Sequence, residues 1–170
     1  MNENDKMLNS NRLLLVFCLL FLTSCSSSAQ HSTSAKEIAH AYFKVYEQRT
    51  DFSEFMSFYD QNVQFEDMVY GVSSSTKNDL KEFFDWSRGN FSVVGGKPSL
   101  VVNKLVVEGN CVVASGYFNQ FNYNEAEMGP WRFIITLEFN DAGKIIRQTD
   151  WINYTPRKNF LGGENLNQKL

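Results

Sequence analysis

The fold is decided by residues 99–154, which read SLVVNKLVVEGNCVVASGYFNQFNYNEAEMGPWRFIITLEFNDAGKIIRQTDWINY. This stretch contains four runs rich in Val, Ile, Phe, Tyr and Trp, at residues 99–108, 111–122, 131–140 and 144–154, and these residue types favour strands. Gly109 and Asn110 separate the first two runs, and residues 140–143 separate the last two. Because Asn, Asp and Gly tolerate the positive φ angles of tight turns, the stretch predicts an antiparallel meander of four strands, interrupted by a longer polar loop at residues 123–130.

Three helix starts are expected before this meander. Each is a Ser, Thr or Asp followed three residues later by an acidic residue, so that the first side chain can accept a hydrogen bond from a free backbone N–H. The pairs are Ser34 with Glu37, Asp51 with Glu54, and Thr76 with Asp79. A short strand is expected between the second and third helices, where Val63, Phe65 and Asp67 share one face. Helices followed by strands predict an α+β domain with its helices on one face of a curved sheet.

The first residues have the pattern of an export signal. An uninterrupted apolar run, Leu13–Leu22, follows two basic residues. The run is too short to span a bilayer but suits the apolar part of a signal peptide. It leads into Leu22-Thr23-Ser24-Cys25, which resembles the bacterial lipobox, whose cysteine is acylated, for example with palmitate, and becomes the new N-terminus. The expectation is therefore a lipoprotein signal peptide at residues 1–24 and a membrane anchor at Cys25.

This interpretation divides the chain into four parts. The signal at residues 1–24 is followed by the lipidated cysteine and a Ser-rich tether at 25–34, a folded domain at 35–156 and a C-terminal tail at 157–170. The residue after the cysteine, Ser26, resembles the sorting preference for the outer membrane of Gram-negative bacteria. We expect the protein in the bacterial cell envelope, anchored to the outer membrane and facing the periplasm.

The composition argues against several classes of function. The chain has 170 residues, a formal net charge of −3 and no run of Lys or Arg, so no nucleic-acid partner is expected. His40 is the only histidine of the expected domain and Cys111 its only cysteine, so neither a metal site nor an internal disulfide is expected. No nucleotide-binding motif is present, and we expect no cofactor. Aromatic residues make up 15% of the chain, which indicates either a ring-rich core or an aromatic-lined cavity.

Three motifs carry a resemblance to a known family: FEDMVYG at residues 65–71, KEFF at 81–84 and FNDAGKI at 139–145. Together with the order of the elements from about residue 35 to 154, they resemble the nuclear transport factor 2-like superfamily, in its SnoaL-like and ketosteroid isomerase-like branch. The resemblance implies a cystatin-like α+β roll, in which three N-terminal helices wrap a cone-shaped, curved antiparallel sheet around a pocket. The aromatic residues would then be pocket wall as well as core.

The resemblance to ketosteroid isomerase implies roles for individual residues. Asp67 matches the general base, Tyr42 the tyrosine that donates a hydrogen bond to the developing oxyanion, and Tyr59 a supporting tyrosine. Two positions depart from the pattern: Phe84 stands where another tyrosine is usual, and Ile135 where a protonated aspartate would complete the oxyanion hole. Because each missing donor lowers the stabilisation of the transition state, these departures argue against steroid isomerisation itself.

A second candidate acid, Asp150, lies in the last expected strand. Its side chain reaches the pocket only if the even-numbered residues of that strand face inward. Asp67 remains open to two interpretations, as a pocket acid or as a carboxylate that caps a turn. The expected pocket lining consists of seven aromatic residues: Tyr42, Tyr46, Tyr59, Phe65, Phe84, Trp131 and Trp151.

Two functions of different classes remain open. In the first, which we prefer, the domain binds a small apolar or aromatic molecule in its pocket, or binds a partner protein or a second copy of itself as a homodimer on the exposed face of its sheet. In the second, it is a cofactor-independent isomerase, cyclase or dehydratase with Asp67 as base, Tyr42 as donor and Asp150 as auxiliary acid. The second function requires Asp67 and Tyr42 to meet in one cavity.

Overall fold

The computed structural model describes residues 34–160, 162–164 and 166–169. The expected signal peptide, Cys25 and all of the expected tether except its last residue lie outside these described residues. Within the described part of the chain, none of the helices is long and apolar enough to cross a membrane.

Three helices form at the places that the capping pattern predicts. They are α2 (Ala35–Gln48), α3 (Phe52–Ser57) and α4 (Lys77–Phe84). The side chain of the residue before each helix accepts a hydrogen bond from the backbone N–H three residues on, and Ser34 and Glu37 form a complete capping box. All three predicted helix starts are therefore confirmed.

The main sheet has six strands in the order β2-β1-β9-β8-β5-β4. Their bounds are Tyr59–Asp67 (β1), Val72–Ser74 (β2), Leu100–Glu108 (β4), Cys111–Phe118 (β5), Trp131–Phe139 (β8) and Ile145–Ile152 (β9). All pairs are antiparallel except β1 and β9, which are parallel. The sheet is thus mixed, whereas a wholly antiparallel sheet was expected from the sequence. The alternation of residues along a strand indicates which face is buried, but it does not indicate the direction of the neighbouring strand.

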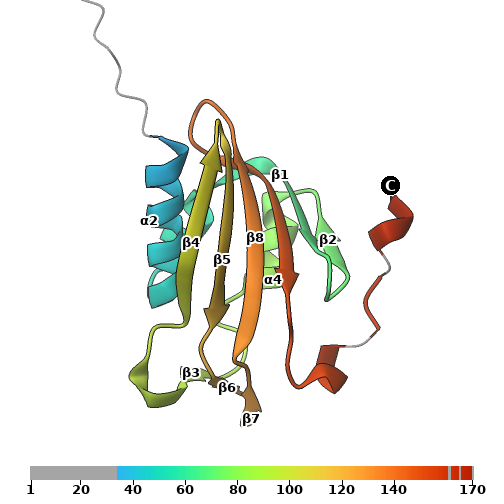
Figure 1. Ribbon diagram of the computed structural model, residues 1–170. Coiled ribbons are helices and arrows are strands. Elements are labelled where there is room, and N and C mark those ends of the chain that lie inside the picture. Colours follow the sequence, from blue (N-terminus) through green and yellow to red (C-terminus); the bar gives the residue numbers. More distant parts are fainter. Residues whose placement is uncertain (1–33, 161, 165, 170) are drawn as a thin grey trace, which may run out of the picture. The chain divides into compact units, whose positions relative to one another are not determined.

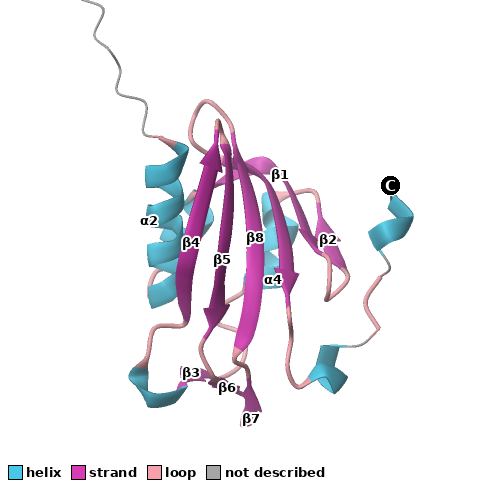
Figure 2. Cartoon of the chain, viewed as in Figure 1, coloured by secondary structure: helices cyan, strands magenta, loops and turns pink. Residues whose placement is uncertain are grey.

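The helices lie on one face of the curved sheet (Figures 1 and 2), with α2 packed against β4 and β5 and α4 against β1. The layer between them is rich in rings: Phe55 stacks on Tyr42 at 5.3 Å between ring centroids and meets Trp86 at 4.8 Å. This arrangement confirms the predicted α+β class. The other face of the sheet carries Ile134 and Trp151, which are half-exposed.

A second, small sheet closes one end of the main sheet (Figure 1). It contains β3 (Phe91–Val93), β6 (Phe121–Tyr123) and β7 (Ala126–Met128) in the order β3-β6-β7. Residues 123–130, expected as a loop, therefore include a strand. The sequence of this region shows no run of alternating apolar residues, and the strand forms by hairpin pairing of β7 with β6.

The segment 157–170 was expected to be a tail, but its described part packs against the domain. It contains the short 3₁₀-helices η3 (Arg157–Phe160) and η4 (Leu166–Lys169). The Phe160 ring stacks on Tyr154 at 4.6 Å between centroids, the backbone N–H of Glu164 donates to the carbonyl of Gly71 (3.0 Å), and Leu166 is buried. The sequence does not indicate this packing because Phe160 and Leu166 are isolated in a Gly-containing stretch with no helical or strand period.

Candidate functional site

A cavity of about 240 Å³ lies between the inner face of the main sheet, the helices and the small sheet. Six of the aromatic rings that line it come from five strands or helices and from the C-terminal segment: Tyr46, Phe84, Phe118, Phe121, Trp131 and Phe160. Three of these, Tyr46, Phe84 and Trp131, are among the predicted lining residues. The cavity also contains two carboxyl groups, those of Asp67 and Asp150.

The two carboxyl groups are brought together by the parallel pairing of β1 with β9. Asp67 and Asp150 are register partners, and the backbone N–H of Met68 donates to the carbonyl of Asp150 (2.9 Å). Both side chains are almost fully buried, with 1% and 2% of their surface exposed. Buried, adjacent carboxyl groups in an aromatic cavity are a typical arrangement for binding a polar group or for proton transfer.

Asp67 caps a turn and also lines the cavity. One carboxylate oxygen accepts the backbone N–H groups of Val69 (3.1 Å) and Tyr70 (2.8 Å), which fixes the turn after β1, and the other accepts the Tyr154 hydroxyl. Burial raises the pKa of Asp67, and the hydrogen bonds from Tyr154 and the two backbone groups partly oppose this shift. Asp67 is therefore a turn carboxylate that also lines the cavity, with both of its oxygens already occupied.

Asp150 is the less constrained acid. Its Oδ1 accepts a hydrogen bond from Gln148 Nε2 (2.9 Å), and among the described residues nothing donates to its Oδ2. Burial raises the pKa of Asp150 well above the usual range; the hydrogen bond from Gln148 lowers it and the nearby charge of Asp67 raises it further. A carboxyl group with a raised pKa and a free oxygen can donate or accept a proton at that oxygen.

Tyr42 and Tyr59 lie behind the carboxyl pair and do not line the cavity. Their hydroxyls are 2.8 Å apart and both reach Gln148 Oε1, Tyr59 at 2.8 Å and Tyr42 at 3.2 Å. Burial raises the pKa of both tyrosines. The convergence of Tyr42 with Asp67 in one cavity, which the enzyme function requires, is therefore not found, because the Tyr42 hydroxyl is bonded to Gln148, which in turn donates to Asp150.

Two further predicted lining residues lie elsewhere. Phe65 is buried beneath Phe83 and Phe84, at 5.1 and 5.6 Å between ring centroids, and belongs to the core. Trp151 is 50% exposed on the opposite face of the sheet, where it borders a shallow hollow beside Ile134. Its placement follows from the strand period: the inward direction of Asp150 requires the next residue to point outward.

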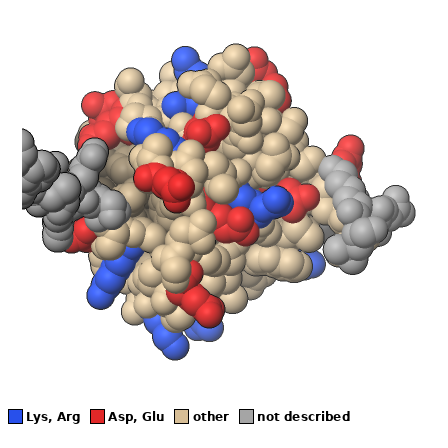
Figure 3. All heavy atoms as spheres, turned by 90° about the horizontal axis from the view of Figure 1, so that it is seen from above, with Lys and Arg blue, Asp and Glu red and all other residues tan. Residues whose placement is uncertain are grey.

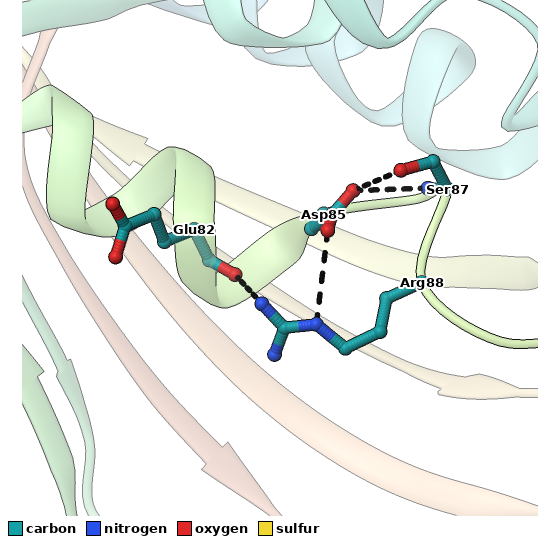
Figure 4. A network of polar contacts seen from close by, with 4 residues as sticks. All are labelled: Glu82, Asp85, Ser87 and Arg88. Carbon is teal, nitrogen blue, oxygen red and sulfur yellow. Dashed lines mark hydrogen bonds and ion pairs between the residues drawn. The ribbon is translucent and has the colours of Figure 1, made fainter.

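Charged side chains surround the mouth of the cavity. Figure 4 shows that Arg88 donates to the backbone carbonyl of Glu82 (2.8 Å) and lies 3.7 Å from Asp85, which also accepts two hydrogen bonds from Ser87. The hydrogen bond from the Ser87 side chain holds the pKa of Asp85 below its ordinary value. Arg49, at the end of α2, also lines the cavity.

Other kinds of site find no support among the described residues. No group of three or more His, Cys, Asp or Glu side chains there could hold a metal ion. Basic and acidic residues are interspersed on the surface seen in Figure 3, without the continuous basic patch that nucleic acid would require.

Sequence reasoning missed three residues of the site: Gln148, Tyr154 and Arg49. Gln148 and Tyr154 have the same parity as Asp150 near the end of the chain, so the period of two could have identified them once Asp150 was taken as inward. Arg49 follows a helix as an ordinary charged residue, and no pattern distinguishes it.

No family model and no curated protein matches the chain. Many solved structures are similar to it. A protein of Shewanella putrefaciens CN-32 described as a SnoaL-like polyketide cyclase has a TM-score of 0.61 and 13% identity, over 75% of this chain and 95% of that one. Its counterpart in Shewanella denitrificans OS-217 has a TM-score of 0.59 and 16% identity, over 75% and 96%. A protein of Kribbella flavida DSM 17836 described as a ketosteroid isomerase has a TM-score of 0.52 and 19% identity, over 69% and 76%.

These likenesses concern the arrangement of the helices and strands. At such low identity they establish the architecture and leave the chemistry to the residues of the cavity. The chain has the nuclear transport factor 2-like fold, as its sequence motifs predicted.

Proposed function

We propose that this domain binds a small cyclic or aromatic molecule in the cavity. The observation that carries the proposal is an aromatic-lined cavity with two buried carboxyl groups on one side of it. Ligand sites typically combine an apolar wall with a few polar groups that fix orientation. Here the rings would supply the apolar contact, and Asp150 and Tyr154 would supply the polar contacts.

The size of the cavity supports a small ligand. Its volume of about 240 Å³ exceeds that of the ~150 Å³ engineered cavity that holds benzene, so a substituted ring or a compact bicyclic molecule would fit. Larger polycyclic molecules would require the mouth to open.

The experiment is a thermal-shift screen of neutral mono- and bicyclic aromatic compounds, followed by calorimetry on the hits. The two tryptophans provide a matched pair of variants. Trp131→Ala removes a ring that lines the cavity and should weaken binding, whereas Trp151→Ala removes a ring on the outer face and should not. Hits that bind the Trp131 and Trp151 variants equally well would place the ligand outside the cavity, and the absence of any hit would contradict the proposal.

A second candidate is acid–base catalysis of an isomerase or cyclase type, and the unoccupied oxygen of Asp150 favours it. In this proposal Asp150, rather than Asp67 with Tyr42, would move a proton at a carbon next to a carbonyl group. The bound hits should then be incubated with the protein in D₂O and their C–H signals followed by NMR. Deuterium exchange that Asp150→Asn abolishes would support catalysis, and binding without exchange would leave the domain a binding module.

We further propose that the domain is tethered to the bacterial envelope through Cys25. The lipobox resemblance supports this proposal. Cells that express the full chain would be labelled with a fatty-acid analogue and fractionated. Cys25→Ser should abolish the label and release the protein from the membrane fraction, and unchanged membrane retention would contradict the tether.

A further inference from the structure

Arg49 occupies a backbone position that favours glycine. It terminates α2 with φ 49° and ψ 36°, in the left-handed region, and its backbone N–H donates to the carbonyl of Val45 (3.0 Å). Side chains are disfavoured in this region, and helices commonly place Gly or Asn there. The backbone therefore does not explain an arginine at this position, and the reason lies in its side chain.

Two aromatic rings hold the guanidinium at the mouth of the cavity. The Cζ atom of Arg49 lies 4.2 Å from the centre of the Phe91 ring and 4.9 Å from that of Trp86. Phe91 belongs to β3 and Trp86 to the segment after α4, so two separate elements fix the same group. A planar cation between ring faces is well positioned for a partner that arrives from the cavity side.

The charge of Arg49 is not neutralised by the protein. In the part of the chain that the structure describes, no carboxylate lies within ion-pair distance of the guanidinium and no acceptor takes a hydrogen bond from it. Asp85, the acidic residue at the mouth, is engaged by Ser87 and Arg88. Burial lowers the pKa of Arg49, which shows that its surroundings disfavour the cation. An anion would remove this cost.

The cavity is therefore polarised. One side holds the Asp67 and Asp150 carboxyl groups, and the mouth holds an unpaired cation, with aromatic rings between them. We propose that the ligand is an aromatic or cyclic carboxylate that binds with its anionic group on Arg49 and its uncharged end toward Asp150. This inference rests on the proposed binding function and adds the chemical class and the orientation of the ligand.

The test uses two probes of nearly equal shape, cinnamate and its neutral amide, cinnamamide. Their dissociation constants are measured by calorimetry with the wild-type protein and with Arg49→Gln, which removes the charge. Arg49→Gly is the second variant, because the left-handed backbone suits glycine if glutamine destabilises the fold. Lys44→Gln is the matched control: it removes a positive charge from the same helix, one that pairs with Glu47 (3.5 Å) and does not line the cavity.

We expect cinnamate to bind the wild-type protein about tenfold or more tightly than cinnamamide, the effect of one charge-assisted hydrogen bond. Both Arg49 variants should lose this preference, and Lys44→Gln should keep it. Equal binding of the two probes, or an undiminished preference in folded Arg49 variants, would overturn the anion site and leave the binding function standing. If neither probe binds, the inference fails, and the screen of neutral aromatic compounds decides the binding function separately.

Discussion

The hydroxyls of Tyr42 and Tyr59 should show a strong, non-additive effect on stability. Three hydrogen-bond distances connect the Tyr42 hydroxyl, the Tyr59 hydroxyl and Gln148 Oε1, but the two tyrosines have only two protons to donate. In Tyr59→Phe, Tyr42 can still donate to Gln148, and in Tyr42→Phe, Tyr59 can. Each single variant therefore loses one hydrogen bond, which costs about 1 kcal/mol.

The double variant Tyr42→Phe/Tyr59→Phe removes both donors. It leaves Gln148 Oε1 unpaired in a residue with 0% exposed surface, and an orphaned buried acceptor costs a further ~1–3 kcal/mol. The double variant should thus lose roughly 3–5 kcal/mol of the free energy of unfolding, more than the sum of the single losses.

The assay is urea-induced unfolding of the wild type, the two single variants and the double variant, analysed as a double-mutant cycle. Tyr46→Phe serves as control, because Tyr46 lies on the same helix and its hydroxyl makes no hydrogen bond to another described residue. If the losses of unfolding free energy in the two single variants add up to the loss in the double variant within about 0.5 kcal/mol, the tyrosines and Gln148 do not share their protons, and the reasoning is refuted.

Three further predictions concern pH, the C-terminal segment and assembly. Burial raises the folded-state pKa of Asp150, so the contribution of this group to stability is present at low pH and is lost as the pH rises through that pKa. Asp150→Asn should therefore have a higher melting temperature than the wild type near neutral pH. The melting temperatures of the two proteins should converge below about pH 4. A Cβ atom on Gly163 would clash with the carbonyl oxygen of Tyr70, so Gly163→Ala should detach the described segment 162–164 from the domain, and limited proteolysis should cut there faster than in the wild type. If the exposed sheet face forms the expected homodimer, light scattering should find a dimer that Trp151→Asp converts to a folded monomer; a dimer that persists would place the interface elsewhere.

The helix starts could be predicted because a cap is a local device. Ser34, Asp51 and Thr76 each act on an N–H three residues away, so the necessary information lies within one helical turn. The two hairpins of the meander are equally local, and the structure pairs Glu108 with Cys111 as the turn at 109–110 requires.

The site was less predictable because its geometry depends on pairing across the chain. Asp150 and Trp151 were both expected in the pocket, yet adjacent residues of a strand face opposite ways, and only the pairing of β9 with β1 decides which faces inward. Tyr42 has the position along the chain that the family resemblance implies, but its hydroxyl is occupied by Gln148, a residue that no sequence motif connected to it. Arg49 gains its significance from two rings that lie about 40 residues away, which no local pattern encodes.

The parallel pairing of β1 with β9 also determines when the site can exist. It closes a loop that begins near residue 67 and ends near residue 150, so Asp67 has no neighbouring carboxyl group until almost the entire chain has been synthesised. Contacts of such long sequence separation form late and slow the folding of the domain. A chain that stops before β9 would lack Asp150 and the strand that carries it, so a nascent protein could not form the proposed ligand site before β9 is made.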